Sequence, residues 1–335
     1  MATRLSDLAA QAGVSTATVS RVLSGKVGVS AESRQAVLAA LDVLGYERPE
    51  RLRSRSAGLV GLLVPELENP IFPAFVQAIE GGLSRKGFTP LLCTQSPGGT
   101  SEDEYVEMLL TRDASGIVFV SGLHADTTAS MERYQRLRSR GLPFVLINGF
   151  SPDVDATVFS CDDAAGVDLA IGHLISLGHR RIGLATGPQR FVPAKRKLDR
   201  FAEALRSRLD IANVDESISL SLFTVEGGQT AAGALLDSGH TAIVCGSDIM
   251  ALGAIRAARA RGLAVPNDVS VIGFDDSKLV AFTDPPLTTV RQPVGAIADA
   301  AVNTLVAEIE GVVGSHSEML FQPELVVRGS TAPAR

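Results

Sequence analysis

The chain has 335 residues, which is enough for two or three domains with a substantial core. Its 45% hydrophobic and 20% charged content is ordinary for a globular protein, and no apolar run approaches the roughly 20 residues that span a bilayer. The net charge of −6 is uneven, because residues 1–57 hold eight Lys and Arg against five Asp and Glu. A basic amino-terminal segment therefore precedes an acidic remainder, which favours nucleic-acid binding at that segment. The lack of a long apolar run excludes an integral membrane protein.

Three short helical patterns occupy residues 5–44, and each is apolar on one side. The first pattern ends at Gly13, which can adopt the left-handed conformation that closes a helix. Ser15 can cap the second helix and Ser30 the third, because each side chain can accept a backbone N–H of the first turn. The side chains expected to face inward are Leu5, Leu8, Ala9 and Ala12 in the first, Val19, Val22 and Leu23 in the second, and Val37, Ala40, Leu41 and Leu44 in the third.

Two short helices joined by a glycine turn and braced by a third predict a helix-turn-helix, whose second helix enters the DNA major groove. The outward side of the second helix is small and hydroxylated and ends in Arg21. Small residues permit close approach, hydroxyl groups bond to phosphates, and Arg can read guanine O6 and N7. The alternative from the pattern alone is a small all-α bundle with an ordinary solvated face.

The segment A-x-x-A-G-V-S-x-x-T-V-S-R-V-L, over residues 9–23, resembles the headpiece of the lactose-repressor (LacI/GalR) family of bacterial transcription regulators. The resemblance continues in G-L-L-V-P-E-L-E-N-P-I-F (61–72), S-V-I-G-F-D-D (270–276) and P-L-T-T-V-R-Q (286–292), so that it covers nearly the whole chain. It implies a DNA-binding headpiece over residues 1–46. The residues expected to contact base edges are Thr16, Ala17 and Arg21, and those expected mainly to hold phosphates are Thr3, Ser15, Thr18, Ser20 and Ser24, the last of which replaces the usual Asn.

Residues 47–58, E-R-P-E-R-L-R-S-R-S-A-G, carry four arginines and no apolar stripe, which indicates a linker. Taken alone, the segment is equally consistent with a disordered basic tether. In the family it resembles, this hinge folds on DNA and wedges a leucine into the minor groove. That resemblance makes Leu52 the candidate wedge, although the segment is a few residues shorter than the family's usual spacer.

From residue 59 to the carboxyl terminus, strand-like and helix-like patterns alternate, which predicts parallel α/β sheets. Apolar runs predict strands at 58–64, 89–93, 116–120, 143–148, 157–160, 181–185, 219–223, 241–245 and 269–274, and two more short strands around 317–328. A break near 150–156 divides the units into two similar halves. The predicted fold is therefore an all-α helix-turn-helix headpiece plus an α/β core (59–335) of two Rossmann-like parallel-sheet subdomains, with crossovers near 156–162, 288–293 and 320–324 and a ligand cleft like that of periplasmic binding proteins.

Open α/β sheets bind ligands beyond the carboxyl ends of their strands. The turns at those ends carry acids, amides, a cation and aromatic rings, which suit a polyhydroxylated ligand. The predicted effector-binding residues are Asn69, Phe72, Asn148, Phe159, Lys197, Ser247, Asp275 and Gln292. Lys197 stands where the family usually has an Arg, and Ser247 where Asn is common. The same turns also carry Asp162, Asp163, Asp248 and Asp276 as further candidates. Asp162 and Asp248 are equally consistent with helix caps, Asp276 with a turn residue that bonds to the backbone, and Phe159 with a core residue.

No nucleophile elbow, zinc-protease motif, phosphate-binding loop or dinucleotide fingerprint is present, so we expect no enzyme activity, cofactor or metal. The three cysteines, Cys93, Cys161 and Cys245, are far apart and form no CxxC pair, which indicates a reducing compartment. The amino terminus lacks the charged start and apolar core of a secretory signal. A cytoplasmic location is therefore expected.

These observations predict a homodimeric DNA-binding regulator, most simply a repressor, that grips a pseudo-palindromic operator and responds to a sugar. The resemblance implies that the effector changes the orientation of the two core halves and thereby releases DNA. One alternative is a regulator that binds a purine or a phosphorylated metabolite, since Lys195, Arg196 and Lys197 would suit an anion. A second alternative is a sugar-binding carrier protein, which would not need the basic headpiece.

Overall fold

The computed structural model of the protein describes residues 5–24, 28–46, 56–95, 98–312, 314 and 316–335. It divides into two compact units, Met1–Ala57 and Gly58–Arg335. Thr3 and Leu52, predicted as DNA contacts, lie outside the described residues, as does most of the predicted hinge. Within the described part of the chain, no helix is both long enough and apolar enough to cross a membrane.

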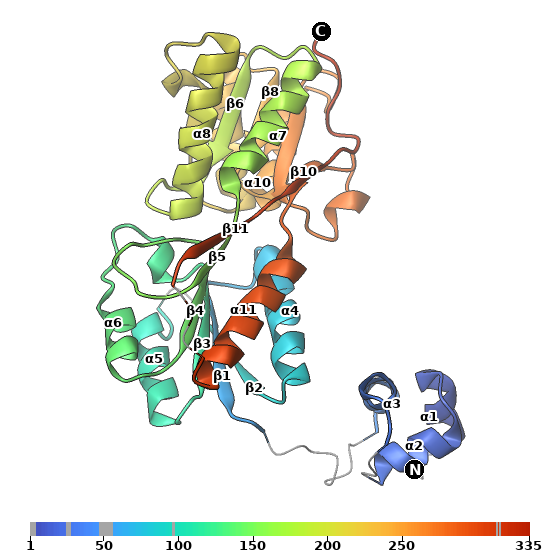
Figure 1. Ribbon diagram of the computed structural model, residues 1–335. Helices are drawn as coiled ribbons and strands as arrows, with labels where there is room; N and C mark the ends of the chain where they lie inside the picture. The colour runs from blue at the N-terminus through green and yellow to red at the C-terminus, as the bar shows by residue number, and fades with distance from the viewer. Residues whose placement is uncertain (1–4, 25–27, 47–55, 96–97, 313, 315) are drawn as a thin grey trace. The chain divides into compact units, whose positions relative to one another are not determined.

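The described residues of the amino-terminal unit form three helices, α1 (Leu5–Ala12), α2 (Thr16–Leu23) and α3 (Ala31–Val43) (Figure 1). Gly13 has φ +64°, as the predicted helix-ending conformation requires. The hydroxyl of Ser15 accepts the Thr18 backbone N–H at 3.1 Å, and that of Ser30 accepts the Ser33 N–H at 3.1 Å. Both predicted caps are thus confirmed. They could be predicted from the sequence because a cap bonds to a backbone N–H only three residues further along the chain.

The three helices bury one apolar cluster, which consists of Leu8, Ala9, Val19, Val22, Val37, Ala40 and Leu41. The prediction was wrong for Leu5 and Leu44, which are 41% and 38% exposed. Leu5 is the first residue of α1 and Leu44 follows α3, so each lies at a helix end where the other helices do not cover it. The small core therefore rests on the middle turns of the helices.

Among its described residues, the carboxyl-terminal unit contains two six-stranded sheets, each with helices on both faces. The first sheet has the order β11-β5-β4-β3-β1-β2, and all its strand pairs are parallel. We call this sheet and its helices the first lobe. Its elements are β1 (Leu59–Val64), α4 (Ile71–Arg85), β2 (Thr89–Thr94), α5 (Glu102–Thr111), β3 (Gly116–Val120), α6 (Glu132–Ser139), β4 (Phe144–Ile147), β5 (Val158–Cys161), α11 (Val294–Ile309) and β11 (Glu318–Phe321).

The second sheet has the order β12-β10-β9-β8-β6-β7, in which only β12 is antiparallel to its neighbour. We call this sheet and its helices the second lobe. Its elements are α7 (Asp163–Ser176), β6 (Ile182–Thr186), α8 (Val192–Leu209), β7 (Ile218–Leu220), α9 (Val225–Asp237), β8 (Ala242–Cys245), α10 (Asp248–Ala260), β9 (Ser270–Asp275), β10 (Thr288–Arg291) and β12 (Glu324–Val326).

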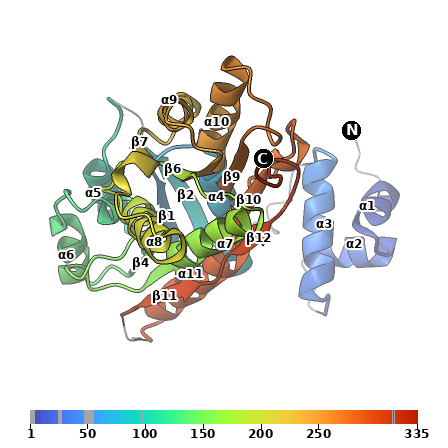
Figure 2. The ribbon, with the colours of Figure 1, turned by 90° about the horizontal axis from the view of Figure 1, so that it is seen from above.

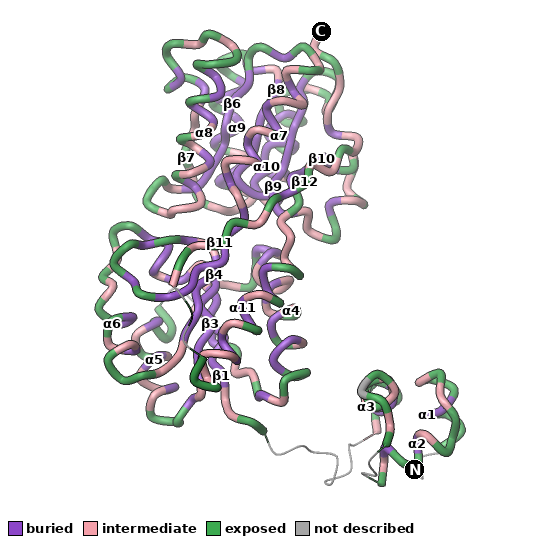
Figure 3. The backbone as a smooth tube through the Cα atoms, in the orientation of Figure 1, coloured by how far each residue is buried: buried purple, intermediate pink, exposed green. Residues whose placement is uncertain are grey.

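The chain passes between the lobes three times. It leaves the first sheet after β5, returns after β10 to place α11 on the first sheet, and crosses again between β11 and β12. The inner strands of both sheets are buried while the outer helix faces and the edge strands are partly exposed (Figure 3), since each sheet is packed between two helix layers. In the view from above, α7 and α8 lie on one side of the second sheet and α9 and α10 on the other (Figure 2).

The predicted strands of both lobes are confirmed to within a few residues, but the run 219–223 was too long. The observed β7 ends at Leu220, and Leu222 beyond it is 64% exposed. Because β7 is the edge strand of its sheet, its apolar residues are not covered on both faces as those of the inner strands are. Periodicity alone does not distinguish an edge strand from a buried one.

Candidate functional site

The exposed side of α2 is formed by the residues predicted to contact DNA. Thr16, Ala17, Ser20 and Arg21 are exposed, while Val19 and Val22 on the opposite side are buried. Small side chains beside one arginine allow the helix to enter a major groove closely. The structure thus places the predicted base-contacting residues together on one helix face.

Two of the predicted phosphate contacts bond to the helix itself. The Ser15 hydroxyl caps α2, and the Ser24 hydroxyl donates to the carbonyl oxygens of Ser20 at 2.7 Å and Arg21 at 3.1 Å. These hydroxyl groups satisfy the ends of the helix, so phosphate binding by them would compete with a local hydrogen bond.

In the second lobe, a buried ion pair joins α8 to the start of α7. The Lys197 ammonium contacts Asp163, and their side chains are only 7% and 6% exposed. The ammonium also lies 4.0 Å from the centre of the Phe274 ring. Burial raises the pKa of Asp163, an effect that Lys197 opposes. The lysine charge is therefore neutralised within the lobe.

Asp275, the last residue of β9, is held in a strained conformation with φ +117°. Its Oδ1 accepts a hydrogen bond from Gln292 Nε2 at 2.7 Å, whereas its buried Oδ2 has no hydrogen-bond partner among the described residues. Burial, and then repulsion from Asp248, raise the pKa of Asp275 well above its usual value. A buried carboxylate oxygen in this setting is an acceptor for a ligand hydroxyl group.

Asp248 was considered a helix cap, but the structure assigns that role to Ser247, whose hydroxyl accepts the Met250 N–H. Asp248 is 1% exposed and accepts hydrogen bonds from Thr289 Oγ1 at 2.5 Å and the Ser277 N–H at 2.6 Å. Burial raises its pKa to about 6. The cap assignment was wrong because Asp248 follows the cap by one residue, which turns its side chain inward.

Asp276 was considered a backbone-bonding turn residue, and this was also wrong. Its carboxylate instead pairs with Arg291 at 2.7 Å and with Arg328 at 2.6 Å. Asp162, in contrast, does cap α7, since its Oδ1 accepts the Ala165 N–H at 2.9 Å. The cap by Asp162 could be predicted because its donor is three residues away, whereas the partners of Asp276 come from β10 and from the carboxyl-terminal segment, far along the chain.

The remaining predicted effector residues belong to the first lobe. Asn69 is 5% exposed, and its Oδ1 accepts the Ile71 N–H at 3.3 Å. The next residue along the chain, Phe72, is partly buried and packs against the core. Asn148 follows β4 in the left-handed conformation, with φ +60°. Phe159 is fully buried and lies 6.4 Å from the Phe321 ring, which agrees with its alternative role in the core.

The predicted effector residues therefore form two groups, one in each lobe. In the second lobe, Lys197 contacts Asp163 and the Phe274 ring, and Asp275, the residue after Phe274, accepts a hydrogen bond from Gln292, whereas Ser247 caps α10. Asp163 lies two positions after the end of β5 and was a further candidate in the sequence. One signal in the sequence could have pointed to Asp163 as a site residue. It begins one predicted helix, and Lys197, which has the opposite charge, lies near the start of the next.

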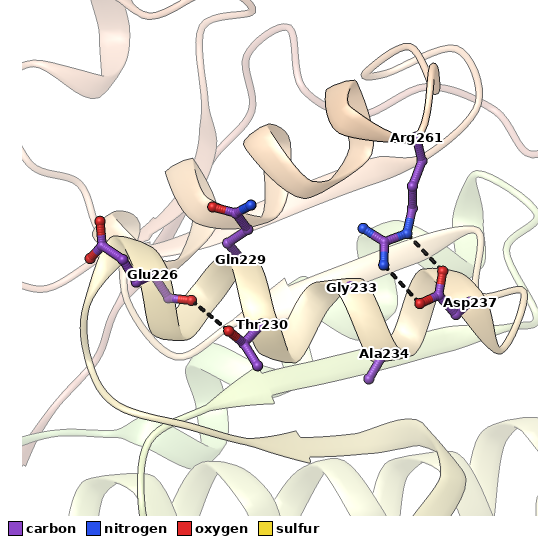
Figure 4. A pocket seen from close by; sticks show the side chains of 7 residues that line it. All are labelled: Glu226, Gln229, Thr230, Gly233, Ala234, Asp237 and Arg261. Atoms are coloured by element: carbon purple, nitrogen blue, oxygen red, sulfur yellow. Dashed lines mark hydrogen bonds and ion pairs between the residues drawn. The ribbon is translucent and has the colours of Figure 1, made fainter.

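None of the predicted residues lines the pocket of about 500 Å³ on α9 (Figure 4). The lining of that pocket includes the ion pair of Arg261 with Asp237, whose side chains are 34% and 66% exposed. A second pocket, of about 430 Å³, lies at the carboxyl ends of β6 and β7, between residues 188–190 and 220–222. Only the second is on the side of the sheet where open α/β folds bind ligands.

Comparisons with known proteins agree with this division of the chain. The model of the bacterial regulatory proteins of the lacI family matches residues 4–49, and that of the periplasmic binding protein-like domain matches residues 171–331. The HTH-type transcriptional regulator MalR of Streptomyces coelicolor is 64% identical over 337 residues, which cover 100% of this chain and 98% of that protein. The HTH-type transcriptional repressor CytR of Escherichia coli is 34% identical over 336 residues, covering 98% and 96%.

Solved structures of similar chains extend the comparison to ligands. The CelR transcriptional regulator in complex with cellobiose has a TM-score of 0.73 and 31% identity, covering 98% of this chain and 100% of that one. The lac repressor dimer bound to operator and the anti-inducer ONPF has a TM-score of 0.71 and 27% identity, covering 99% and 100%. The likeness therefore includes both the amino-terminal unit and the two-lobed unit.

Proposed function

Because this chain belongs to the lacI family of bacterial regulatory proteins and is a DNA-binding transcriptional regulator, not an enzyme, we propose that it is a cytoplasmic homodimeric repressor controlled by a sugar. The headpieces of two protomers bind the two halves of a pseudo-palindromic operator, with α2 in the major groove. A small carbohydrate binds at the carboxyl ends of the strands of the two-lobed unit and shifts the population of lobe arrangements.

The observation that carries the sugar assignment is the buried acidic group in the second lobe. Asp163, Asp248 and Asp275 are all at most 6% exposed, while Lys197 is the cation in contact with Asp163. An anionic ligand would meet three carboxyl groups there, and the cation Lys197 is already paired with Asp163. A neutral polyhydroxylated ligand instead offers hydroxyl donors to the free Oδ2 of Asp275.

The cations that suggested an anionic effector all have carboxylate partners. Lys195 pairs with Asp199 at 2.7 Å, Arg196 with Glu318 at 2.7 Å, and Lys197 with Asp163. A phosphorylated metabolite would have to displace these carboxylates. This argument favours a sugar over a phosphometabolite. Similar structures with bound sugars support it, among them CelR with cellobiose and a LacI family transcriptional regulator from Enterococcus faecium with ribose.

The test is selection of bound fragments from random double-stranded DNA, followed by anisotropy titration of the selected site. Monosaccharides, disaccharides, nucleobases and sugar phosphates are then added in turn at constant salt, because salt strongly affects DNA affinity. We expect a neutral sugar to lower operator affinity. Release by a nucleobase or a sugar phosphate alone would contradict the sugar assignment. A complete lack of sequence preference in DNA binding under all conditions would contradict the proposal that the protein is an operator-binding repressor.

A further inference from the structure

Two turns from different lobes meet beyond the carboxyl ends of β3 and β6. Asp126 and Phe191 form an isolated antiparallel bridge. Both the backbone N–H and the hydroxyl group of Thr127 donate to the Arg190 carbonyl oxygen, at 2.8 and 2.9 Å. Arg190 Nε in turn donates to Asp126 Oδ2 at 3.0 Å. The lobes thus touch at a point separate from their three covalent crossovers.

The first-lobe turn is held in place by a buried polar network. Glu102 is 1% exposed; its Oε1 accepts the Tyr134 hydroxyl at 2.5 Å, and its Oε2 accepts the Leu123 N–H at 2.9 Å. The Tyr134 oxygen also accepts the His124 N–H at 2.8 Å. Burial raises the pKa of the Glu102 carboxyl. The network fixes Leu123 through Glu102 and His124 through Tyr134, and these two residues precede Asp126 by three and two positions.

Asp126 itself has two separate tasks. Its Oδ1 accepts the Thr128 N–H at 2.9 Å and the Thr128 hydroxyl at 2.7 Å, so it closes its own turn. Its Oδ2 is the oxygen that contacts Arg190 of the other lobe. The carboxylate is therefore oriented before the lobes meet, which lowers the entropic cost of the contact.

The second-lobe turn leads directly into the helix that bears Lys197. Phe191 is the residue before α8, and its ring lies 6.5 Å from that of Phe223 and 4.7 Å from the Arg190 guanidinium. Gly187 leaves no room for a side chain, since a Cβ there would collide with the Phe223 ring. A packed turn thus couples the interlobe contact to α8 and the ion pair of Lys197 with Asp163.

We propose that Asp126 and Arg190 form a latch that favours the arrangement of the two lobes in which these turns meet, here called closed, and so sets effector affinity without touching the effector. This rests on the proposed function in that the sugar favours the same closed arrangement. Arg190 is 52% and Asp126 12% exposed, so the ion pair is weak and shifts closure by about two- to fivefold. A bias of this size leaves the equilibrium responsive to ligand.

The test measures hydrogen exchange of the full chain without ligand. Asp126→Asn keeps the oxygen that closes the turn and removes the charge, and Arg190→Gln removes the other charge. We expect each variant to speed exchange of the Thr127 amide, which donates to Arg190, by about two- to fivefold. The double variant should show no more than either single one, because the two residues act as one pair.

Lys195→Ala is the matched control, because it removes the ion pair of Lys195 with Asp199 on the same helix, which does not join the lobes. Exchange at Thr127 should not change in this variant. The latch is refuted if exchange in Asp126→Asn/Arg190→Gln equals that of the wild type, or if the two single effects add.

Calorimetric titration with cellobiose then separates the two proposals. If cellobiose binds the wild type, its Kd should rise about two- to fivefold in both latch variants and stay unchanged in Lys195→Ala. An unchanged Kd in the latch variants would overturn the claim that the latch sets effector affinity. If cellobiose does not bind the wild type, that result counts against a disaccharide effector, while the exchange measurement still decides whether the latch exists.

Discussion

Replacing Lys197 by Met tests whether the buried ion pair of the second lobe is built as described. Methionine keeps an unbranched side chain that can pack against the Phe274 ring, but it removes the charge that faces Asp163. Because both partners are at most 7% exposed, the remaining carboxylate is left buried and unpaired. Breaking such a pair costs about 3–5 kcal/mol of unfolding free energy.

The pH dependence has a definite sign. Burial raises the pKa of Asp163 in the folded protein, so the protonated carboxyl favours folding. A raised carboxyl pKa contributes stability that is present below the unfolded pKa and lost as pH rises through the folded pKa. Without Lys197 the pKa rises further, and the deficit of Lys197→Met should therefore shrink as the pH is lowered from neutral toward the unfolded pKa of Asp.

The assay is urea unfolding followed by circular dichroism at neutral and mildly acidic pH. Asp163→Asn/Lys197→Met removes both charges and should recover most of the loss, whereas Lys195→Met, at an exposed pair, should stay within about 0.5 kcal/mol of the wild type. A loss below about 1 kcal/mol in Lys197→Met, or a double variant as unstable as the single one, would refute the reasoning.

Three further predictions follow from the two sites. Arg21→Ala should weaken specific DNA binding by about 1–3 kcal/mol and relax base preference at one position, which selection from randomised sites would detect; unchanged preference would contradict base readout. Asp275→Ala should abolish the response of operator affinity to the sugar while sparing operator binding in anisotropy titrations, and normal release would show that the pocket is misplaced. Because burial raises the pKa of Asp248 to about 6, its stabilising effect is present below the unfolded pKa and lost as pH rises through 6. The unfolding free energy of the wild type relative to Asp248→Asn should therefore fall by about 2 kcal/mol between pH 4 and pH 7 in urea titrations, and a constant difference would contradict the shift.

Much of the architecture could be predicted because its signals are local. The caps at Ser15 and Ser30 depend on donors three residues away, and the inner strands are recognisable as continuous apolar runs. The exposed face of α2 follows from helical periodicity, which places Arg21 opposite the buried Val19 and Val22.

The roles of the charged residues were not predictable in this way, since their partners come from distant parts of the chain. From the sequence, Arg196 and Lys197 suggested a binding site for an anion. In the structure they pair with Glu318 and Asp163, which lie 122 and 34 residues away along the chain. Asp126 and Arg190, 64 residues apart, gave no signal at all. Composition and periodicity determined which segments form helices and strands; only the packing of the two lobes decided which charges are neutralised, which oxygen of Asp275 stays open, and where the lobes touch, because electrostatic partners depend on proximity in space.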